Sequence, residues 1–313
     1  MKKVLFISVI AVVLFFSCKR EHSAATSPAG KKYRVSLNIL NFKQSQGTFS
    51  NKRIINALAS DTLTNLNSYF DVLYYVVYDN NTGRAINPPV MRDSTMANMG
   101  MITDSLPAGS YEVRIVAGKK NLALNNYFVG FDATYGYGGY NWQDTFWAKS
   151  DITVGNADIS KEVTLNRAVG KVEVQLLDDI PASADSIIMT ITPEYATMNL
   201  DRGQAEIADA TSTTIFALLI PASAKGHPFT FDKIAGNTLT PFTVDIKCKD
   251  ASDVILGHAI IYNVSSPANM KAVLAGNLFN NGPPSSSPQA FQVKIDTAWN
   301  SVPNQESFSL RRH

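Results

Sequence analysis

The sequence predicts an all-β protein built from two β-sandwich domains in series. The chain has 313 residues, about twice the length of a common single domain. Many short segments alternate apolar and polar residues, and turn residues separate them at short, fairly regular intervals. Alternation with a period of two is typical of strands with one buried face, and such a succession of short strands is typical of sandwiches.

The composition is that of an ordinary globular chain, with 45% hydrophobic and 17% charged residues. These fractions exclude wholesale disorder, a collagen-like chain and a multi-span membrane protein. Lys and Arg number 28 and Asp and Glu 26; without Lys2 and Lys3, which lie in a segment expected to be removed, the balance is 26 against 26. Nucleic-acid binding usually needs a clustered basic face, so no such partner is expected.

Residues 1–17 have the features of a secretory signal peptide. Lys2 and Lys3 precede an apolar run over residues 4–16, which is about 20 Å long as a helix and too short to span a bilayer comfortably. Residues 14–18, Leu-Phe-Phe-Ser-Cys, resemble a bacterial lipobox, which is cleaved between Ser17 and Cys18 and lipidated on the cysteine. Phe16 departs from the usual pattern, so a plain signal peptide or a short anchor helix is the alternative.

Residues 18–32 are polar, small and punctuated by Pro28 and Gly30, and we expect a flexible tether there. The second cysteine, Cys248, lies in an alternating run over residues 242–248. That position predicts a buried, inert thiol. With Cys18 acylated, no disulfide can form within one chain.

The folded body is predicted to start with a strand over residues 33–40, in which Tyr33, Val35, Leu37 and Ile39 form one apolar face. A second strand over residues 72–78 stops at Asp-Asn-Asn-Thr-Gly, residues 79–83. Calcium loops use similar residues, but no Glu ligand follows at the required spacing, so a hairpin turn is favoured. Further strands are predicted at residues 110–117, 162–165, 171–176, 186–191, 213–220, 242–248, 254–262, 270–274 and 291–295.

These strands divide into a first sandwich over residues 33–166 and a second over residues 167–302, followed by a polar tail over residues 303–313. The chain contains no Gly-x-Ser-x-Gly, His-Glu-x-x-His, Cys-x-x-Cys or Gly-Lys-Ser/Thr motif, which are the usual marks of hydrolase, metal, redox and phosphate sites. His22 and His313 lie in the tether and at the last residue, and His227 and His258 in a predicted turn and strand. We therefore expect no enzyme activity, no metal and no cofactor.

One segment, residues 127–147, holds nine aromatic residues interspersed with glycines. Exposed rings stack on sugars and anchor interfaces, which makes this segment a candidate glycan or partner contact. The alternative, which we favour, is a long loop that folds its rings back over an open sheet end. The candidate contact residues are Tyr135, Tyr137, Tyr140, Trp142 and Trp147.

Several segments, taken in order, resemble the fimbrillin and fimbrial-anchor family of Bacteroidota. They are the lipobox, Tyr-Tyr-Val-Val-Tyr-Asp at 74–79, Leu-Pro-Ala-Gly-Ser-Tyr-Glu-Val-Arg-Ile-Val-Ala at 106–117, Val-Thr-Leu-Asn-Arg-Ala-Val-Gly-Lys-Val-Glu-Val at 163–174, and the closing segments 270–279 and 291–299. The resemblance implies two transthyretin-like sandwiches, and a lipoprotein displayed at the outer-membrane surface that contacts other fimbrial subunits.

The resemblance also implies how such subunits join. Polymerising members are cut near the first strand by an Arg-specific protease, and a strand from another subunit then fills the groove by β-augmentation. Arg34 and Arg53 are the candidate processing sites, although Arg53 is also explained as a solvated loop residue. The polar tail lacks a long apolar donor strand, which favours an anchor or accessory role over a shaft role.

The sequence therefore predicts a surface-displayed, lipid-anchored outer-membrane protein that anchors or forms part of a fimbria through strand pairing. The alternative function is a glycan-binding outer-membrane lipoprotein that uses the aromatic segment 127–147.

Overall fold

The computed structural model describes residues 30–43, 66, 69–127, 130–135, 141–206, 212–279 and 291–296. The predicted signal peptide, Cys18, Arg53 and the polar tail lie outside these residues. Within them the chain is almost entirely strand and turn, which confirms the predicted all-β sandwich class. In this part of the chain no helix is long and apolar enough to cross a membrane.

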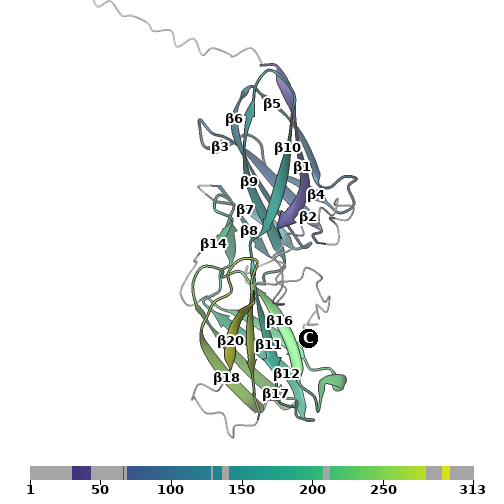
Figure 1. The fold of residues 1–313 in the computed structure, drawn as a ribbon, viewed down its shortest axis with the longest axis vertical. Helices are drawn as coiled ribbons and strands as arrows, with labels where there is room; N and C mark the ends of the chain where they lie inside the picture. The colour runs from purple at the N-terminus through teal and green to yellow at the C-terminus, as the bar shows by residue number, and fades with distance from the viewer. Residues whose placement is uncertain are drawn as a thin grey trace, which may run out of the picture.

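The first sandwich is one eight-stranded sheet in the order β3-β2-β6-β9-β10-β1-β5, with β4 also paired to β2. β9 and β10 pair only at Asn166 and Arg167, so the sheet folds there into two layers that enclose a buried apolar core. It occupies one end of the molecule (Figure 1). Its strands are β1 (Lys32–Lys43), β2 (Val72–Asp79), β3 (Arg84–Ala85), β4 (Val90–Asp93), β5 (Met101–Pro107), β6 (Gly109–Gly118), β9 (Thr145–Val154) and β10 (Ile159–Arg167).

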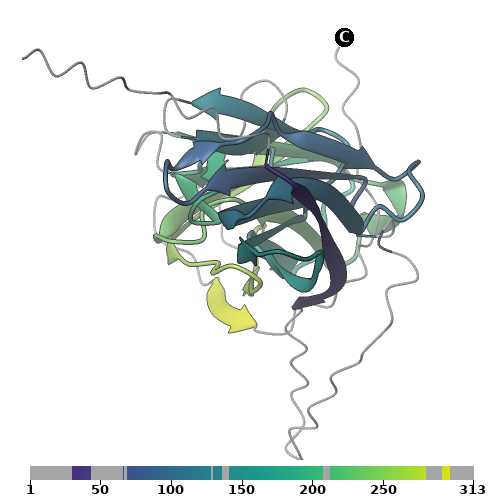
Figure 2. The ribbon, with the colours of Figure 1, turned by 90° about the horizontal axis from the view of Figure 1, so that it is seen from above.

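The second sandwich packs the sheet β16-β11-β19-β20 against the sheet β15-β12-β17-β18. Figure 2 shows β20, in yellow, at the periphery of the molecule. Its strands are β11 (Gly170–Leu176), β12 (Ala184–Thr192), β15 (Thr214–Leu219), β16 (Phe229–Ala235), β17 (Phe242–Asp250), β18 (Ile255–Val264), β19 (Lys271–Gly276) and β20 (Gln292–Asp296), with the short 3-10 helix η2 (Ala222–Ala224) after β15.

A fourth sheet joins the two sandwiches and contains strands from both halves of the chain. Its order is β14-β13-β8-β7, and β8 pairs with β13 at Ala133 and Met198. These strands lie between the two sandwiches in Figure 1. They are β7 (Leu122–Tyr127), β8 (Gly130–Tyr135), β13 (Thr197–Asn199) and β14 (Gln204–Glu206).

Both sandwiches place their first strand in the same way. β1 lies between β10, to which it runs parallel, and β5, to which it runs antiparallel. β11 lies likewise between parallel β19 and antiparallel β16. β10 ends at Arg167 and β11 begins at Gly170, close to the predicted boundary between residues 166 and 167, which remains a prediction together with the transthyretin-like topology.

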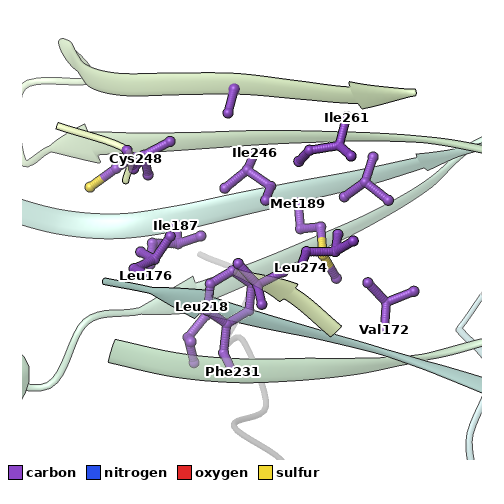
Figure 3. Packing of buried hydrophobic residues seen from close by; sticks show 14 of the residues in the cluster. Val172, Leu176, Ile187, Met189, Leu218, Phe231, Ile246, Cys248, Ile261 and Leu274 are labelled. Atoms are coloured by element: carbon purple, nitrogen blue, oxygen red, sulfur yellow. The ribbon is translucent and has the colours of Figure 1, made fainter. Parts of the chain in front are cut away.

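The core of the second sandwich follows the alternation seen in the sequence. Ile187, Met189 and Ile191 on β12 point inward and are fully buried, and they meet Val244, Ile246 and other residues of the facing strands in one cluster. Figure 3 shows Ile187, Met189 and Ile246 among these side chains. Burial of such side chains is the main favourable contribution to folding.

Two neighbouring isoleucines on β12 test which face of this strand is buried in the core and which is only half-buried. Ile187→Ala should lower the free energy of unfolding by about 2–5 kcal/mol, because it leaves a cavity in the core. Ile188→Ala removes a side chain on the opposite, half-buried face and should cost about 1 kcal/mol or less. Urea unfolding of both variants measures the difference, and equal losses would contradict the assigned faces.

Candidate functional site

The first strand, β1, is held between two strands that are distant in sequence. On one side β1 pairs with parallel β10, starting with Val35 opposite Ile159. On the other side it pairs with antiparallel β5, starting with Lys32 opposite Pro107. Val35, Leu37 and Ile39 are buried in the core of the first sandwich. β1 therefore contributes both backbone pairing on its two sides and an apolar face.

Removal of β1 would leave a defined vacancy, which we call the β1 slot. The backbone groups of β10 and β5 that face β1 would lose their partners, and the pockets of Val35, Leu37 and Ile39 would open. Unpaired strand edges and exposed apolar surface are the two features that bind an incoming strand. The β1 slot is thus chemically suited to another strand of alternating pattern.

Arg34 lies within this paired strand. Its side chain is exposed and forms an ion pair with Asp158, with 3.6 Å between Arg34 Nε and Asp158 Oδ2, and its backbone N–H donates to Asp158 Oδ1 at 2.8 Å. Its backbone pairs opposite Ser105 in β5. Proteases act on exposed or transiently opened backbone, so cleavage at Arg34 requires β1 to open first. Processing at Arg34 and Arg53 stays a prediction.

The aromatic segment lies between the two sandwiches, in a region that we call the junction. Tyr135 is 3% and Trp142 is 1% exposed. Trp142 Nε1 donates to the Tyr195 carbonyl, and Trp147 Nε1 donates to the Leu200 carbonyl at 2.9 Å. The predicted exposed platform is therefore wrong for Tyr135 and Trp142, whose side chains are buried. The favoured alternative of a long loop is also corrected, because residues 130–135 lie in β8 and residues 145–147 in β9.

The other platform candidates have different positions. Trp147 is half-buried, on β9, while Tyr137 and Tyr140 lie outside the described residues. The Tyr135 hydroxyl is buried, with its oxygen 3.0 Å from Thr145 Oγ1. Burial raises its pKa well above the ordinary value, so this phenol stays protonated.

Three glycines let these rings approach the backbone closely. A Cβ added to Gly203 or Gly236 would overlap an indole ring, and a Cβ added to Gly118 would overlap the Tyr135 hydroxyl. Gly203 also has a positive φ of 64°. Glycine is the residue that tolerates both conditions. The pairs are Gly118 with Tyr135, Gly203 with Trp147, and Gly236 with Trp142.

A buried ion pair also lies at the junction. Arg167 is almost fully buried and forms two parallel hydrogen bonds with Asp144, at 2.7 Å from Nε and 2.9 Å from Nη2. Its Nη1 donates to Asn269 Oδ1 at 3.3 Å. A bidentate pair of this kind fixes geometry as well as contributing energy, so it sets how β10 continues into the second sandwich.

Glu194 is a second buried ionisable group and has no solvent exposure. Its carboxylate accepts hydrogen bonds from the backbone N–H groups of Tyr195 at 2.9 Å, Gly236 at 3.2 Å and Asn237 at 2.7 Å. Burial raises the pKa of Glu194 to about 7, although these hydrogen bonds act in the opposite direction. Desolvation penalises the charged form, so the carboxyl titrates near neutral pH.

Lys233 lies nearby, and its Nζ donates to Asn141 Oδ1 at 2.7 Å and to the Trp142 carbonyl at 3.1 Å. Burial lowers its pKa to about 8, while the charge of Glu194 acts to raise it. Neither Glu194 nor Lys233 was predicted as a site residue from the sequence. A signal existed only for Lys233, which shares the inward face of β16 with Phe231 and Ala235.

The described residues contain no group of three or more His, Cys, Asp or Glu side chains able to hold a metal ion. Cys248 is fully buried, and burial raises the pKa of its thiol to about 11. His258 Nε2 lies 2.9 Å from Asp245 Oδ1 on the outer face of the second sandwich. The features of the described residues that remain as candidates for function are the strand edges, including those at the β1 slot, and the buried polar groups at the junction.

No protein-family model and no curated protein sequence matches the chain. Among solved structures, a candidate adhesin of Bacteroides thetaiotaomicron has a TM-score of 0.51 at 10% identity, over 86% of this chain and 97% of the other. The two chains share a fold. The resemblance found in the sequence to a fimbrial family is thereby confirmed at the level of the fold.

Two further solved structures have lower TM-scores of 0.49. The fimbrial anchor protein Mfa2 of Porphyromonas gingivalis is 12% identical, over 86% of this chain and 98% of its own. A candidate polysaccharide-binding protein of Bacteroides thetaiotaomicron is 9% identical, over 85% of this chain and 96% of its own.

The close approach at Gly236 gives a direct test of the junction. Gly236→Ala should destabilise the protein by about 1–3 kcal/mol, because the new methyl group displaces the Trp142 indole from its site, and tryptophan fluorescence should shift to the red. Gly155→Ala is the matched control, since an added Cβ there meets nothing within 4 Å. Thermal unfolding and emission spectra that are the same for both variants would contradict the assigned packing.

Glu194 makes the stability depend on pH. Its pKa is about 7 in the folded protein against an ordinary 4.5, so the folded state binds more protons than the unfolded state between these values. The free energy of unfolding should therefore fall as pH rises from about 5 to about 7.5. Glu194→Gln should flatten this slope, which urea unfolding at several pH values measures. An unchanged slope in the variant would show that a group other than Glu194 causes the pH dependence of the free energy of unfolding.

Proposed function

We propose that this protein is a fimbrial subunit or anchor, displayed at the cell surface and joined to other subunits by strand pairing. The observation that carries the proposal is β1. It is paired along both sides by β10 and β5, and it fills an apolar slot with Val35, Leu37 and Ile39. A strand that is held in this way can be replaced by another strand with the same contacts.

Lipidation at Cys18 would place the body close to a membrane. Residues 19–31 separate Cys18 from the start of β1 at Lys32. Thirteen extended residues span at most about 45 Å, so the first sandwich would stay within that distance of the outer membrane. This part of the proposal rests on the lipobox resemblance.

The tether and β1 are consecutive in the chain, and this links anchoring to the β1 slot. A cut after Arg34 or Arg53 would separate the lipid from the body and would also free part or all of β1. An uncut chain keeps its lipid and keeps the β1 slot filled, which suits a terminal anchor. A chain cut after Arg53 can lose the lipid together with all of β1 and so gain an open slot, which suits a polymerising subunit. A cut after Arg34 removes the lipid but leaves Val35, Leu37 and Ile39 in the body.

The alternative function, glycan binding by the aromatic segment, has less support. Two of its five candidate residues, Tyr135 and Trp142, are buried at the junction. Sugar platforms need exposed ring faces. A non-enzymatic role fits the absence of catalytic motifs from the sequence.

Deletion in the native cell tests the fimbrial role. Without the protein, we expect fimbriae to be released into the medium or not to assemble, as seen by electron microscopy and cell fractionation. Complementation with Cys18→Ser should leave fimbriae unattached, because no lipid can be added. Cys248→Ala, the control at the other cysteine, should restore attachment. Normal cell-bound fimbriae after deletion would refute the role.

A further inference from the structure

β15 is an edge strand with an unusual composition. It pairs with β12 on one side, and in the described part of the chain no strand pairs with its other side. Residues 213–220, Thr-Thr-Ile-Phe-Ala-Leu-Leu-Ile, contain no charged residue, proline or glycine. Ile215 is 70% and Leu219 is 59% exposed. Uncharged segments of high β-propensity readily pair with further strands when exposed.

The other sheet edges among the described residues carry features that oppose pairing. β3, β4, β5, β14, β16 and β20 each contain at least one charged residue. β7 contains two asparagines, and β18 is interrupted by two register shifts against β17. Charges and bulges are the usual protections of an edge, and β15 has neither.

The inward side chains of β15 hold it firmly in the sandwich. Phe216 stacks on Phe231 at 6.4 Å between ring centroids, and Leu218 is buried in the core next to β12 and β16 (Figure 3). The strand is therefore a fixed template, and its outward face consists of Ile215, Ala217 and Leu219. The β12 residues opposite these three are Thr190, Ile188 and Ser186, all uncharged.

We propose that β15 is a self-association edge that pairs antiparallel with β15 of a second copy of this chain. Directly opposite residues of an antiparallel pair lie on the same face. With Ala217 on the two-fold axis, Ile215 lies opposite Leu219 of the second copy, and Phe216 lies opposite Leu218 of the second copy. The outward side chains are large, small and large in the order Ile215, Ala217 and Leu219. In this register the large side chains of one copy therefore lie opposite large side chains of the second copy, and the small Ala217 lies opposite Ala217.

The same pairing brings no like charges together, because neither β15 nor the facing positions of β12 are charged. An isologous contact needs this self-complementarity. It would extend one four-stranded sheet into an eight-stranded sheet across two molecules. A pair of six-residue strands is small beside a standard interface, so we expect a dissociation constant on the order of 10–100 µM.

Sedimentation velocity on the whole chain tests the proposal. The chain carries Cys18→Ser, is kept in mild detergent, and is measured at about 1 to 500 µM, a range that brackets the expected dissociation constant. The chain should show a dimer that grows with concentration, and Leu219→Lys should weaken it at least tenfold. Tyr262→Lys is the matched control, because Tyr262 is 57% exposed on β18 at the opposite edge of the same sheet. A monomer throughout, or loss of the dimer with Tyr262→Lys alone, would overturn the proposal.

Disulfide trapping tests the register in the same background. Opposed Cα atoms in an antiparallel pair lie about 4.5–5.5 Å apart, within the range of a disulfide. Ala217→Cys should therefore cross-link to the second copy on mild oxidation. Ile215→Cys, which is more exposed but off the axis, should not. Equal cross-linking of the two variants, or no cross-link at Ala217→Cys, would refute the two-fold pairing. A cross-link from Ala217→Cys to a different protein, in place of a second copy of this chain, would also refute it.

Discussion

The pairing of each first strand with a distant parallel partner is the constraint on which both sandwiches depend. Parallel strands cannot be joined by a tight turn. Arg34 in β1 contacts Asp158 across 124 positions in sequence, and Glu173 in β11 contacts Lys271 across 98. Closing such loops costs entropy before any contact forms. These strands are therefore held by long-range contacts, and no local hairpin joins β1 to β10 or β5.

The junction is the second consequence of this chain order. Because β10 of the first sandwich leads directly into β11 of the second, the ends of the two cores meet, and polar groups there become buried. Arg167 is matched by Asp144, and Glu194 by three backbone N–H groups. Buried ionic groups often contribute more to specific geometry than to stability. The β8–β13 pairing completes a junction whose geometry is fixed by backbone and side chains together.

The sequence was sufficient to predict the fold class and most long strands, since alternation in segments such as Val35–Leu37–Ile39 is a local property. It did not predict the longer strands β5, β9 and β16, or the shorter strands β3, β4, β7, β8, β13 and β14. Among these, β8 and β13 pair across the two halves of the chain. Whether Trp142 is exposed or buried could not be predicted, for a physical reason: tryptophan serves equally well as an exposed contact residue and as a buried packing residue. The exposure of Trp142 depends on Gly236, 94 positions later, and no local pattern reveals that contact.

The direction of β1 has a mechanical consequence for the proposed anchor. β1 runs from the outer end of the first sandwich towards the second (Figure 1). Tension between a lipid at Cys18 and a partner bound further along the molecule would therefore pull β1 largely along its own length. Its hydrogen bonds to β10 and β5 would be loaded together rather than one after another. Forced unfolding is governed by the rate of opening, and a strand loaded on both sides in this way opens slowly. The paired β1 can thus serve as the mechanical link between membrane and body for as long as it stays uncut.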